Sequence, residues 1–86
     1  SHEAARFVLS GHKDTVRNIS WSPDGTMIAS CSDDGTVRVW NPISGKCLHV
    51  IEGHGGPVVD VAWSPNGAQL VSGSKDKTVK IWSVSE

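Results

Sequence analysis

A repeat with a period of 42 residues constrains the fold of this chain more than any other feature of its sequence. The dipeptide Gly-His at residues 11–12 returns at residues 53–54, and the tripeptide Trp-Ser-Pro at residues 21–23 returns at residues 63–65, with no gap. Repeats of about 40 to 45 residues are typical of arrays in which one repeat alone cannot bury its apolar face. The fold therefore has to be derived repeat by repeat.

Short runs of β-forming residues alternate with turn residues inside each repeat. The segments Pro-Asp-Gly at residues 23–25 and Pro-Asn-Gly at residues 65–67 provide the backbone angles of tight turns. No helical period persists for three turns, so we predict an all-β chain. In the first repeat we expect strands over residues 15–21, 26–31, 36–40 and 47–51.

Apolar residues occupy both parities of the expected strands. Val58 and Val59 are adjacent, and Val61 and Ala62 follow them closely. A strand with one face in water alternates more cleanly between apolar and polar residues. We therefore expect both faces of each sheet to be covered.

The composition argues against two classes of partner. The formal net charge is -1, so the chain has no basic field for nucleic acid and no polybasic segment for a membrane surface. No apolar run approaches the roughly 20 residues that span a bilayer, and the chain does not begin with the apolar stretch of a signal peptide. We expect no nucleic-acid or membrane partner, and a soluble protein in the cytoplasm or elsewhere inside the cell.

The cysteines and the first residues lead to two smaller expectations. Cys31 and Cys47 are too few for the disulfide framework of a small secreted domain and match no redox motif, so we expect free thiols. Residues 1–4 begin without methionine and are expected to be a tag remnant or a disordered start.

The full motif set resembles the WD-repeat (WD-40) family. Each repeat carries Gly-His, then Trp-Ser-Pro-Asp/Asn-Gly, then Ser-x-Ser-x-Asp-x-Thr-Val and a closing tryptophan, over about residues 5–86. The closing dipeptides depart from the family's Trp-Asp, being Trp-Asn at residues 40–41 and Trp-Ser at residues 82–83. The resemblance implies four-stranded antiparallel β-propeller blades.

The resemblance also implies a buried chain of hydrogen bonds in each repeat, which we call the relay. An indole donates, a hydroxyl and an imidazole can each accept and donate, and a carboxylate accepts, so these groups can satisfy one another. One missing partner would leave a buried polar group unpaired at a cost of about 1–3 kcal/mol. The implied relay residues are His12, Ser30, Asp34 and Trp40 in the first repeat, and His54, Ser72, Asp76 and Trp82 in the second.

Enzyme, metal and ligand-stacking readings of the same residues are weaker. A nucleophilic serine needs an accessible hydroxyl on a sharp turn, whereas Ser30 and Ser72 lie in expected strands and their constellation occurs twice. The histidines and cysteines lack paired zinc spacing. The four tryptophans suit core packing better than stacking of bases or sugars. We expect no catalytic residue, no cofactor and no bound metal.

The family's strand arrangement predicts an incomplete set of blades. In that arrangement the outer strand of a blade comes from the start of the next repeat, so blade one spans about residues 11–51 and blade two, about residues 53–86, lacks its outer strand. We expect the strand over residues 5–9 to complete the second blade of another copy. Its residues are Ala5, Arg6, Phe7, Val8 and Leu9.

Head-to-tail contacts of this kind form a ring when the rotation closes. A ring of identical two-blade chains has an even number of blades. By resemblance, WD-type rings usually close with about seven blades and sometimes with about eight, so we favour a tetramer, with a trimer next. A natural fragment of a larger propeller and an engineered or designed protein are the alternatives, because two whole periods suggest excision or design.

By resemblance, such a propeller binds peptides or proteins on its upper face. The alternative is that the loops of the upper face are only solvent-exposed and that the chain is a structural module without a ligand. The expected upper-face residues are Lys13, Asp14, Thr15, Arg17 and Asp33 in the first repeat, and Pro57, Val59 and Lys75 in the second.

Overall fold

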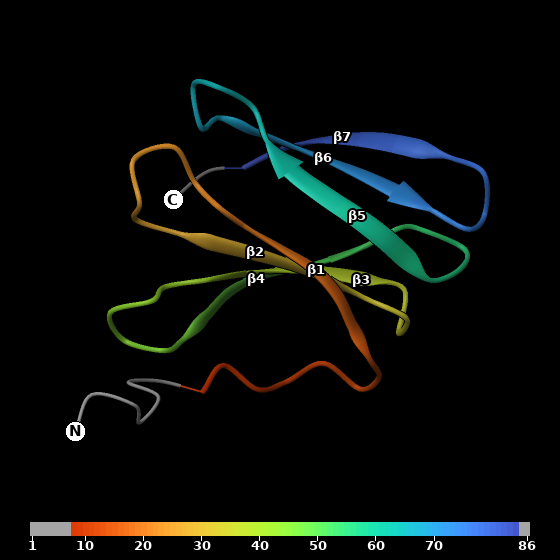
Figure 1. Cartoon of the computed structure of the whole chain (residues 1–86), viewed down its shortest axis with the longest axis horizontal. Helices are drawn as coiled ribbons and strands as arrows, with labels where there is room; N and C mark the ends of the chain where they lie inside the picture. The colour runs from red at the N-terminus through yellow and green to blue at the C-terminus, as the bar shows by residue number, and fades with distance from the viewer. Residues whose placement is uncertain (1–7, 85–86) are drawn as a thin grey trace.

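The computed structural model describes residues 8–84, which form seven strands in two antiparallel sheets (Figure 1). The all-β prediction is confirmed. No helix among these residues has the length and apolar character needed to cross a membrane. The strands are β1 Val16–Trp21, β2 Ile28–Ser32, β3 Thr36–Trp40, β4 Cys47–Glu52, β5 Val58–Trp63, β6 Gln69–Ser74 and β7 Val79–Ser83.

The first sheet has four strands in the order β1-β2-β3-β4. Each strand pairs antiparallel with the next, and tight turns connect them because glycine accepts the positive φ that the turns require. Gly25 has a φ of 74° and Gly35 a φ of 86°. The run that begins at Cys47 is β4, which pairs with β3 and forms one edge of the first sheet.

The second sheet has three strands in the order β5-β6-β7 within residues 8–84. The expected strand over residues 5–9 lies mostly outside the described residues, since Ala5, Arg6 and Phe7 are not among them. Val8 and Leu9 are described, and neither lies in a strand. The described part of the chain is therefore one four-stranded and one three-stranded sheet.

The two sheets pack against each other through β1, β2 and β5, which lie side by side in Figure 1. Because side chains alternate along a strand, only one face of each sheet enters this interface. The buried apolar residues between the sheets are Met27, Ala29, Cys31, Val37 and Val39 from the first repeat, and Val58, Val61 and Leu70 from the second.

In residues 8–84 of a single chain, one face of each sheet packs against the other sheet and the opposite face is open, so coverage of both faces stays a prediction for an assembly with further blades. Ile19 and Trp21 on the outer face of the first sheet are 60% and 56% exposed. Val79 and Ile81 on the outer face of the second sheet are 73% and 65% exposed. Trp21 is therefore not a core residue here, because no neighbouring sheet in the described chain covers it.

Candidate functional site

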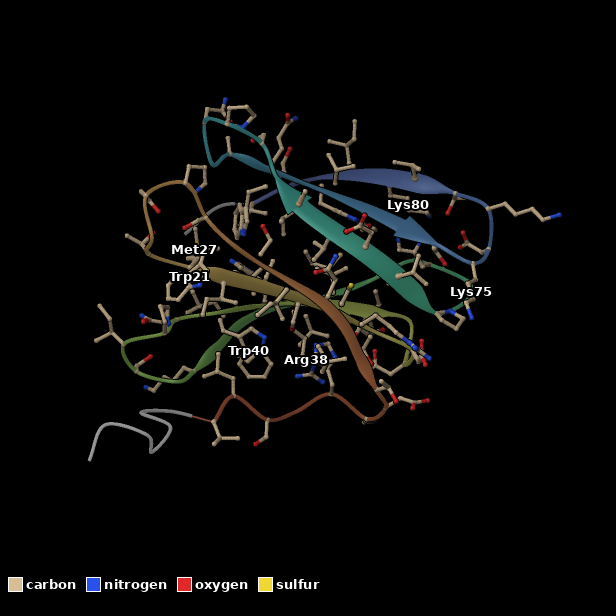
Figure 2. The ribbon with its side chains drawn as sticks, in the orientation of Figure 1. Trp21, Met27, Arg38, Trp40, Lys75 and Lys80 are labelled. Carbon is tan, nitrogen blue, oxygen red and sulfur yellow. The ribbon has the colours of Figure 1, made fainter. Side chains whose placement is uncertain are left out.

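The first relay joins residues from four places in the first repeat. His12 precedes β1, Ser30 lies in β2, Asp34 occupies the turn after β2, and Trp40 ends β3 on the face turned away from the second sheet (Figure 2). Trp40 Nε1 donates to Ser30 Oγ at 2.8 Å, and Ser30 Oγ lies 2.6 Å from His12 Nε2. His12 Nδ1 lies 3.1 Å from Asp34 Oδ2. The structure thus brings these four residues together.

Asp34 accepts several further hydrogen bonds that hold its carboxylate ionised. Thr36 donates to Asp34 Oδ1 through its hydroxyl at 2.6 Å and through its N–H at 2.9 Å, and the Lys13 N–H donates to Oδ2 at 3.0 Å. Burial raises the pKa of Asp34, but the hydrogen bonds from Thr36, Lys13 and His12 outweigh it and lower the pKa below its ordinary value.

The second relay repeats the first at the same spacing. Trp82 Nε1 donates to Ser72 Oγ at 2.8 Å, and His54 Nε2 lies 2.7 Å from the same hydroxyl. His54 Nδ1 lies 3.4 Å from Asp76 Oδ2. Hydrogen bonds from the Thr78 hydroxyl and the Gly55 N–H lower the pKa of Asp76. The same hydrogen-bonded set of residue types therefore occurs in both sheets.

A threonine in each repeat belongs to this network, although the sequence interpretation did not include it. Thr36 and Thr78 each bind the aspartate two residues earlier, and the Thr78 hydroxyl lies 3.1 Å from His54 Nδ1. The signal was present, because an Asp-x-Thr segment recurs in both repeats. A hydroxyl that caps a carboxylate across a tight turn gives this spacing a physical cause.

The geometry of the relays favours an architectural role. Ser30 is 5% exposed and Ser72 1% exposed. Each hydroxyl already accepts an indole N–H and contacts an imidazole. A catalytic serine needs access to its substrate, and these two residues are almost fully buried. In residues 8–84, no group of three or more His, Cys, Asp or Glu side chains could hold a metal ion.

Three of the expected upper-face residues, Arg17, Asp33 and Lys75, lie close together. Arg17 Nε donates to Asp33 Oδ1 at 2.7 Å, and its Nη2 contacts Asp33 Oδ2. The hydrogen bond from Arg17 is the main cause that lowers the pKa of Asp33, and the positive charges of Arg17 and Lys75 add to it. Residues from both repeats therefore form one charged cluster, which we call the Arg17 cluster: Arg17, Asp33 and Lys75.

Two of the remaining upper-face residues, Thr15 and Pro57, accept backbone hydrogen bonds from this cluster. The Asp33 N–H donates to the Thr15 carbonyl at 2.9 Å, and the Lys75 N–H donates to the Pro57 carbonyl at 2.9 Å. Asp14 accepts the Thr15 N–H at 2.7 Å. Lys13 is exposed, and Val59 is 38% exposed.

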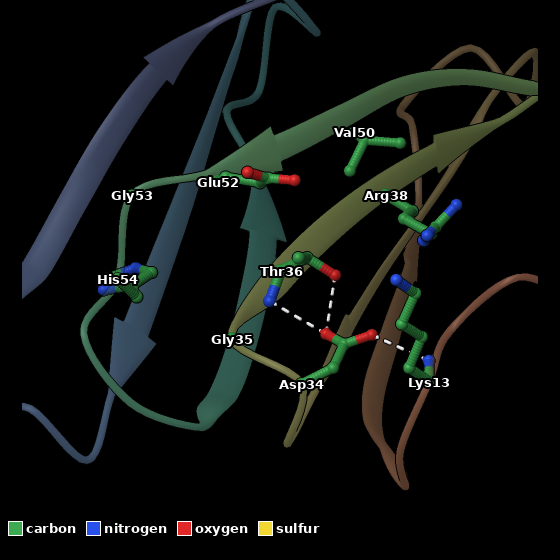
Figure 3. A pocket seen from close by; sticks show the side chains of 9 residues that line it. All are labelled: Lys13, Asp34, Gly35, Thr36, Arg38, Val50, Glu52, Gly53 and His54. Atoms are coloured by element: carbon green, nitrogen blue, oxygen red, sulfur yellow. Dashed lines mark hydrogen bonds between the residues drawn. The ribbon is translucent and has the colours of Figure 1, made fainter.

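A cavity of about 330 Å³ lies beside the first relay (Figure 3). The side chains of Lys13, Asp34, Arg38 and Glu52 line it, so its wall carries two cations and two carboxylates. Sequence reasoning missed this cavity because its wall combines loops and strands from both repeats. Mixed charge gives it no electrostatic preference for one sign of ligand.

Comparison with known proteins places the two repeats in a family. A family model described as WD domain, G-beta repeat matches residues 4–41 and 45–83, which confirms the resemblance. The chain is 64% identical over 33 residues to the probable cytosolic iron-sulfur protein assembly protein CIAO1 homolog of Chlamydomonas reinhardtii, covering 38% of this chain and 9% of that protein.

Two human proteins are also similar to this chain. Striatin-4 is 54% identical over 37 residues, covering 43% of this chain and 5% of striatin-4. Coronin-7 is 48% identical over 42 residues, covering 49% of this chain and 4% of coronin-7. The chain thus spans a tenth or less of the length of these relatives. Because the family model covers both repeats, the chain belongs to the WD-repeat family.

Proposed function

We propose that this chain is a non-enzymatic intracellular WD-repeat module that associates head to tail with further copies and presents a protein-binding surface. WD repeats generally mediate protein–protein interaction, and that part follows from the family. The proposal of self-association rests on one observation. Apolar residues at equivalent positions of the two repeats are buried in one sheet and exposed to solvent in the other.

The outer face of the second sheet carries apolar residues at the positions that are buried between the sheets in the first repeat. Val37 and Val39 of the first sheet are both 0% exposed against the second sheet. Their equivalents 42 residues later are Val79 and Ile81, which are 73% and 65% exposed. A further sheet like the second would cover them.

The outer face of the first sheet supports the same conclusion from the other side. Trp63 Nε1 donates to the Ser20 carbonyl across the interface at 3.0 Å. Its equivalent Trp21 is 56% exposed, and among the described residues its indole N–H has no such partner. In a head-to-tail pair of copies, Trp21 of one copy would donate to the Ala62 carbonyl of the other. The two open faces are therefore mutually complementary.

Apolar burial gives this association a driving force. If each open face exposes about 400 Å² of apolar surface, covering it at about 25 cal/mol per Å² is worth about 10 kcal/mol. That amount is comparable with the stability of a whole domain. An uncovered strand edge at β7 would add a hazard of aggregation.

The expected inter-chain strand has an internal precedent. Residues 5–9 stand 42 positions before residues 47–51 of β4. β4 pairs with β3, the equivalent of β7. We therefore propose that residues 5–9 of one copy pair with β7 of another. The favoured ring is a tetramer, with a trimer next.

The Arg17 cluster is the proposed contact surface for a peptide or protein ligand. It combines an ion pair with a lysine from the adjacent sheet at an exposed loop end. Each copy in a ring would present the same cluster, so the ring would bind multivalently.

In an alternative hypothesis, the same two faces are covered by other repeats of one polypeptide and not by further copies of this chain. The chain spans a tenth or less of the length of the relatives named above. The open faces would then be covered by neighbouring repeats of a longer polypeptide, and the two repeats would be a structural part without a ligand of their own.

Solution mass tests self-association directly. Light scattering on the purified chain should give a multiple of 9.2 kDa, with four copies favoured over three. A stable, folded monomer of 9.2 kDa would exclude the self-assembled ring and leave the alternative hypothesis.

A peptide array on the assembled protein tests the ligand surface. Saturable binding that Arg17→Ala weakens, with the solution mass unchanged, would support the scaffold function. The control Trp40→Ala should instead damage folding, because it removes the indole that donates to Ser30. No binding to any peptide, or equal loss of folding in both variants, would count against the Arg17 cluster.

A further inference from the structure

One polar contact joins equivalent positions of the two repeats across the interface between the sheets. Asn18 Nδ2 donates to Asp60 Oδ1 at 2.7 Å, and the two residues are 42 positions apart. Both occupy the first strand of their sheet, β1 and β5, and both follow a register shift, between Val16 and Asn18 and between Val58 and Asp60. The same local backbone therefore presents an amide in one sheet and a carboxylate in the other.

The two side chains have the same orientation, because each uses its Oδ1 atom in the same local bond. Asn18 Oδ1 accepts the Ile19 N–H at 2.8 Å, and Asp60 Oδ1 accepts the Val61 N–H at 2.9 Å. In Asn18 the remaining polar atom, Nδ2, reaches the next sheet. In Asp60 the corresponding atom is Oδ2, and the same orientation would direct it toward the open side of the second sheet.

This equivalence has a consequence for the junction between two copies, and it rests on the proposed head-to-tail assembly. Within the chain, a donor from Asn18 meets an acceptor of Asp60. Between chains, Oδ2 of Asp60 would meet Oδ1 of Asn18 of the next copy, which places two acceptors together. The junction between copies therefore lacks the hydrogen bond that the junction within the chain possesses.

Asp60 also lies at a hollow that the next copy would fill. The hollow has a volume of about 180 Å³ and is lined by Asp60, Val71, Gly73 and Val79, among others. Covering it removes water from a carboxylate that gains no donor in return, and an ionised group loses more by desolvation than an amide does. Each Asp60 would therefore oppose the burial of the valines around it.

From this asymmetry we infer that Asp60 limits the strength of self-association and makes the contact between copies weaker than the contact within the chain. The residue determines the affinity of the interface rather than the fold of the sheet. An amide at this position would keep the contact with Asn18 and would direct a donor toward the next copy.

The substitution Asp60→Asn tests this inference. The expected result is an association about five- to tenfold tighter, which corresponds to one additional net hydrogen bond. The dissociation midpoint on dilution, followed by analytical ultracentrifugation, measures it. Asp24→Asn is the control, because it removes the same charge from an exposed turn. Thermal unfolding verifies that each variant is folded, and Asp60→Ser replaces Asp60→Asn if the latter does not fold.

The outcomes separate this inference from the proposed function. A wild type that assembles, with Asp60→Asn no tighter than Asp24→Asn, overturns the role of Asp60 and leaves self-assembly intact. A wild type that stays monomeric while Asp60→Asn assembles overturns self-assembly of the natural sequence and supports the role of Asp60. If neither chain assembles at any concentration, both ideas fail.

Discussion

Val37 and Val79 are the same residue type at the same position of two repeats, yet Val37 is 0% exposed and Val79 is 73% exposed. Val37 lies in β3 on the face that meets the second sheet, whereas Val79 lies in β7 on the face that meets no other sheet in residues 8–84. A β-strand with identical chemistry is therefore core in one repeat and surface in the other. Substitutions at these two positions can therefore test the stability of the single chain and the proposed association of copies independently.

Replacing each valine by threonine should have different effects. Val37→Thr buries a hydroxyl between the sheets and should lower the free energy of unfolding by about 1–3 kcal/mol at every protein concentration. Val79→Thr should weaken association instead, so its destabilisation should diminish as concentration rises. Urea unfolding at several concentrations measures both, and identical concentration dependence would contradict the proposed interface.

Removing the hydroxyl at the centre of the first relay should destabilise the fold. Ser30→Ala leaves the indole N–H of Trp40 and Nε2 of His12 without their shared partner in a site where Ser30 is 5% exposed. The free energy of unfolding should fall by about 1–3 kcal/mol. The control Ser44→Ala, which loses only an exposed loop bond of 3.3 Å, should stay within about 0.5 kcal/mol of the wild type. Equal losses would mean that the relay contributes no stability.

Acid should weaken the fold through the relay aspartates. The pKa of Asp34 is lowered from an ordinary value of 3.8, so the folded state binds its proton less readily than the unfolded state. The resulting stabilisation is complete above that pH and is lost as the pH falls toward the lower folded value. Unfolding midpoints in a pH series below about 5 should fall, and Asp34→Asn should make the decline shallower. A variant that declines as steeply as the wild type would exclude Asp34 as a contributor.

The two free cysteines should react at different rates. Cys31 is buried, and burial raises the pKa of its thiol to about 11, whereas Cys47 is exposed. Since the thiolate is the reactive form, an alkylating reagent at pH 8 should modify Cys47 and spare Cys31 until the chain unfolds. Mass spectrometry of peptides from native and unfolded protein distinguishes the sites, and comparable labelling of both in the native state would refute the buried position of Cys31.

Much of the local structure follows from the sequence. Proline and glycine set the turns at residues 23–25 and 65–67, and β-forming runs set the strands between them. The serine and tryptophan of each repeat lie ten positions apart in adjacent antiparallel strands, which lets Trp40 donate to Ser30 and Trp82 to Ser72. These relationships are set within one repeat, so one repeat's sequence is enough to suggest them.

The contacts between the sheets depended on tertiary structure. The influence of Lys75 on Asp33 and the bond from Asn18 to Asp60 were not assigned from the sequence. They depend on how β5 lies against β1, and no spacing within a repeat encodes that placement.

The period of 42 residues determined which positions are equivalent, and the alternation along each strand determined which of them share a face. Neither determined which face is covered. Trp21 and Trp63 have the same motif around them, yet Trp21 is 56% exposed while Trp63 packs against the core and donates to Ser20. Only the packing of one sheet on the other distinguishes them, because burial is a property of the neighbour that a residue meets.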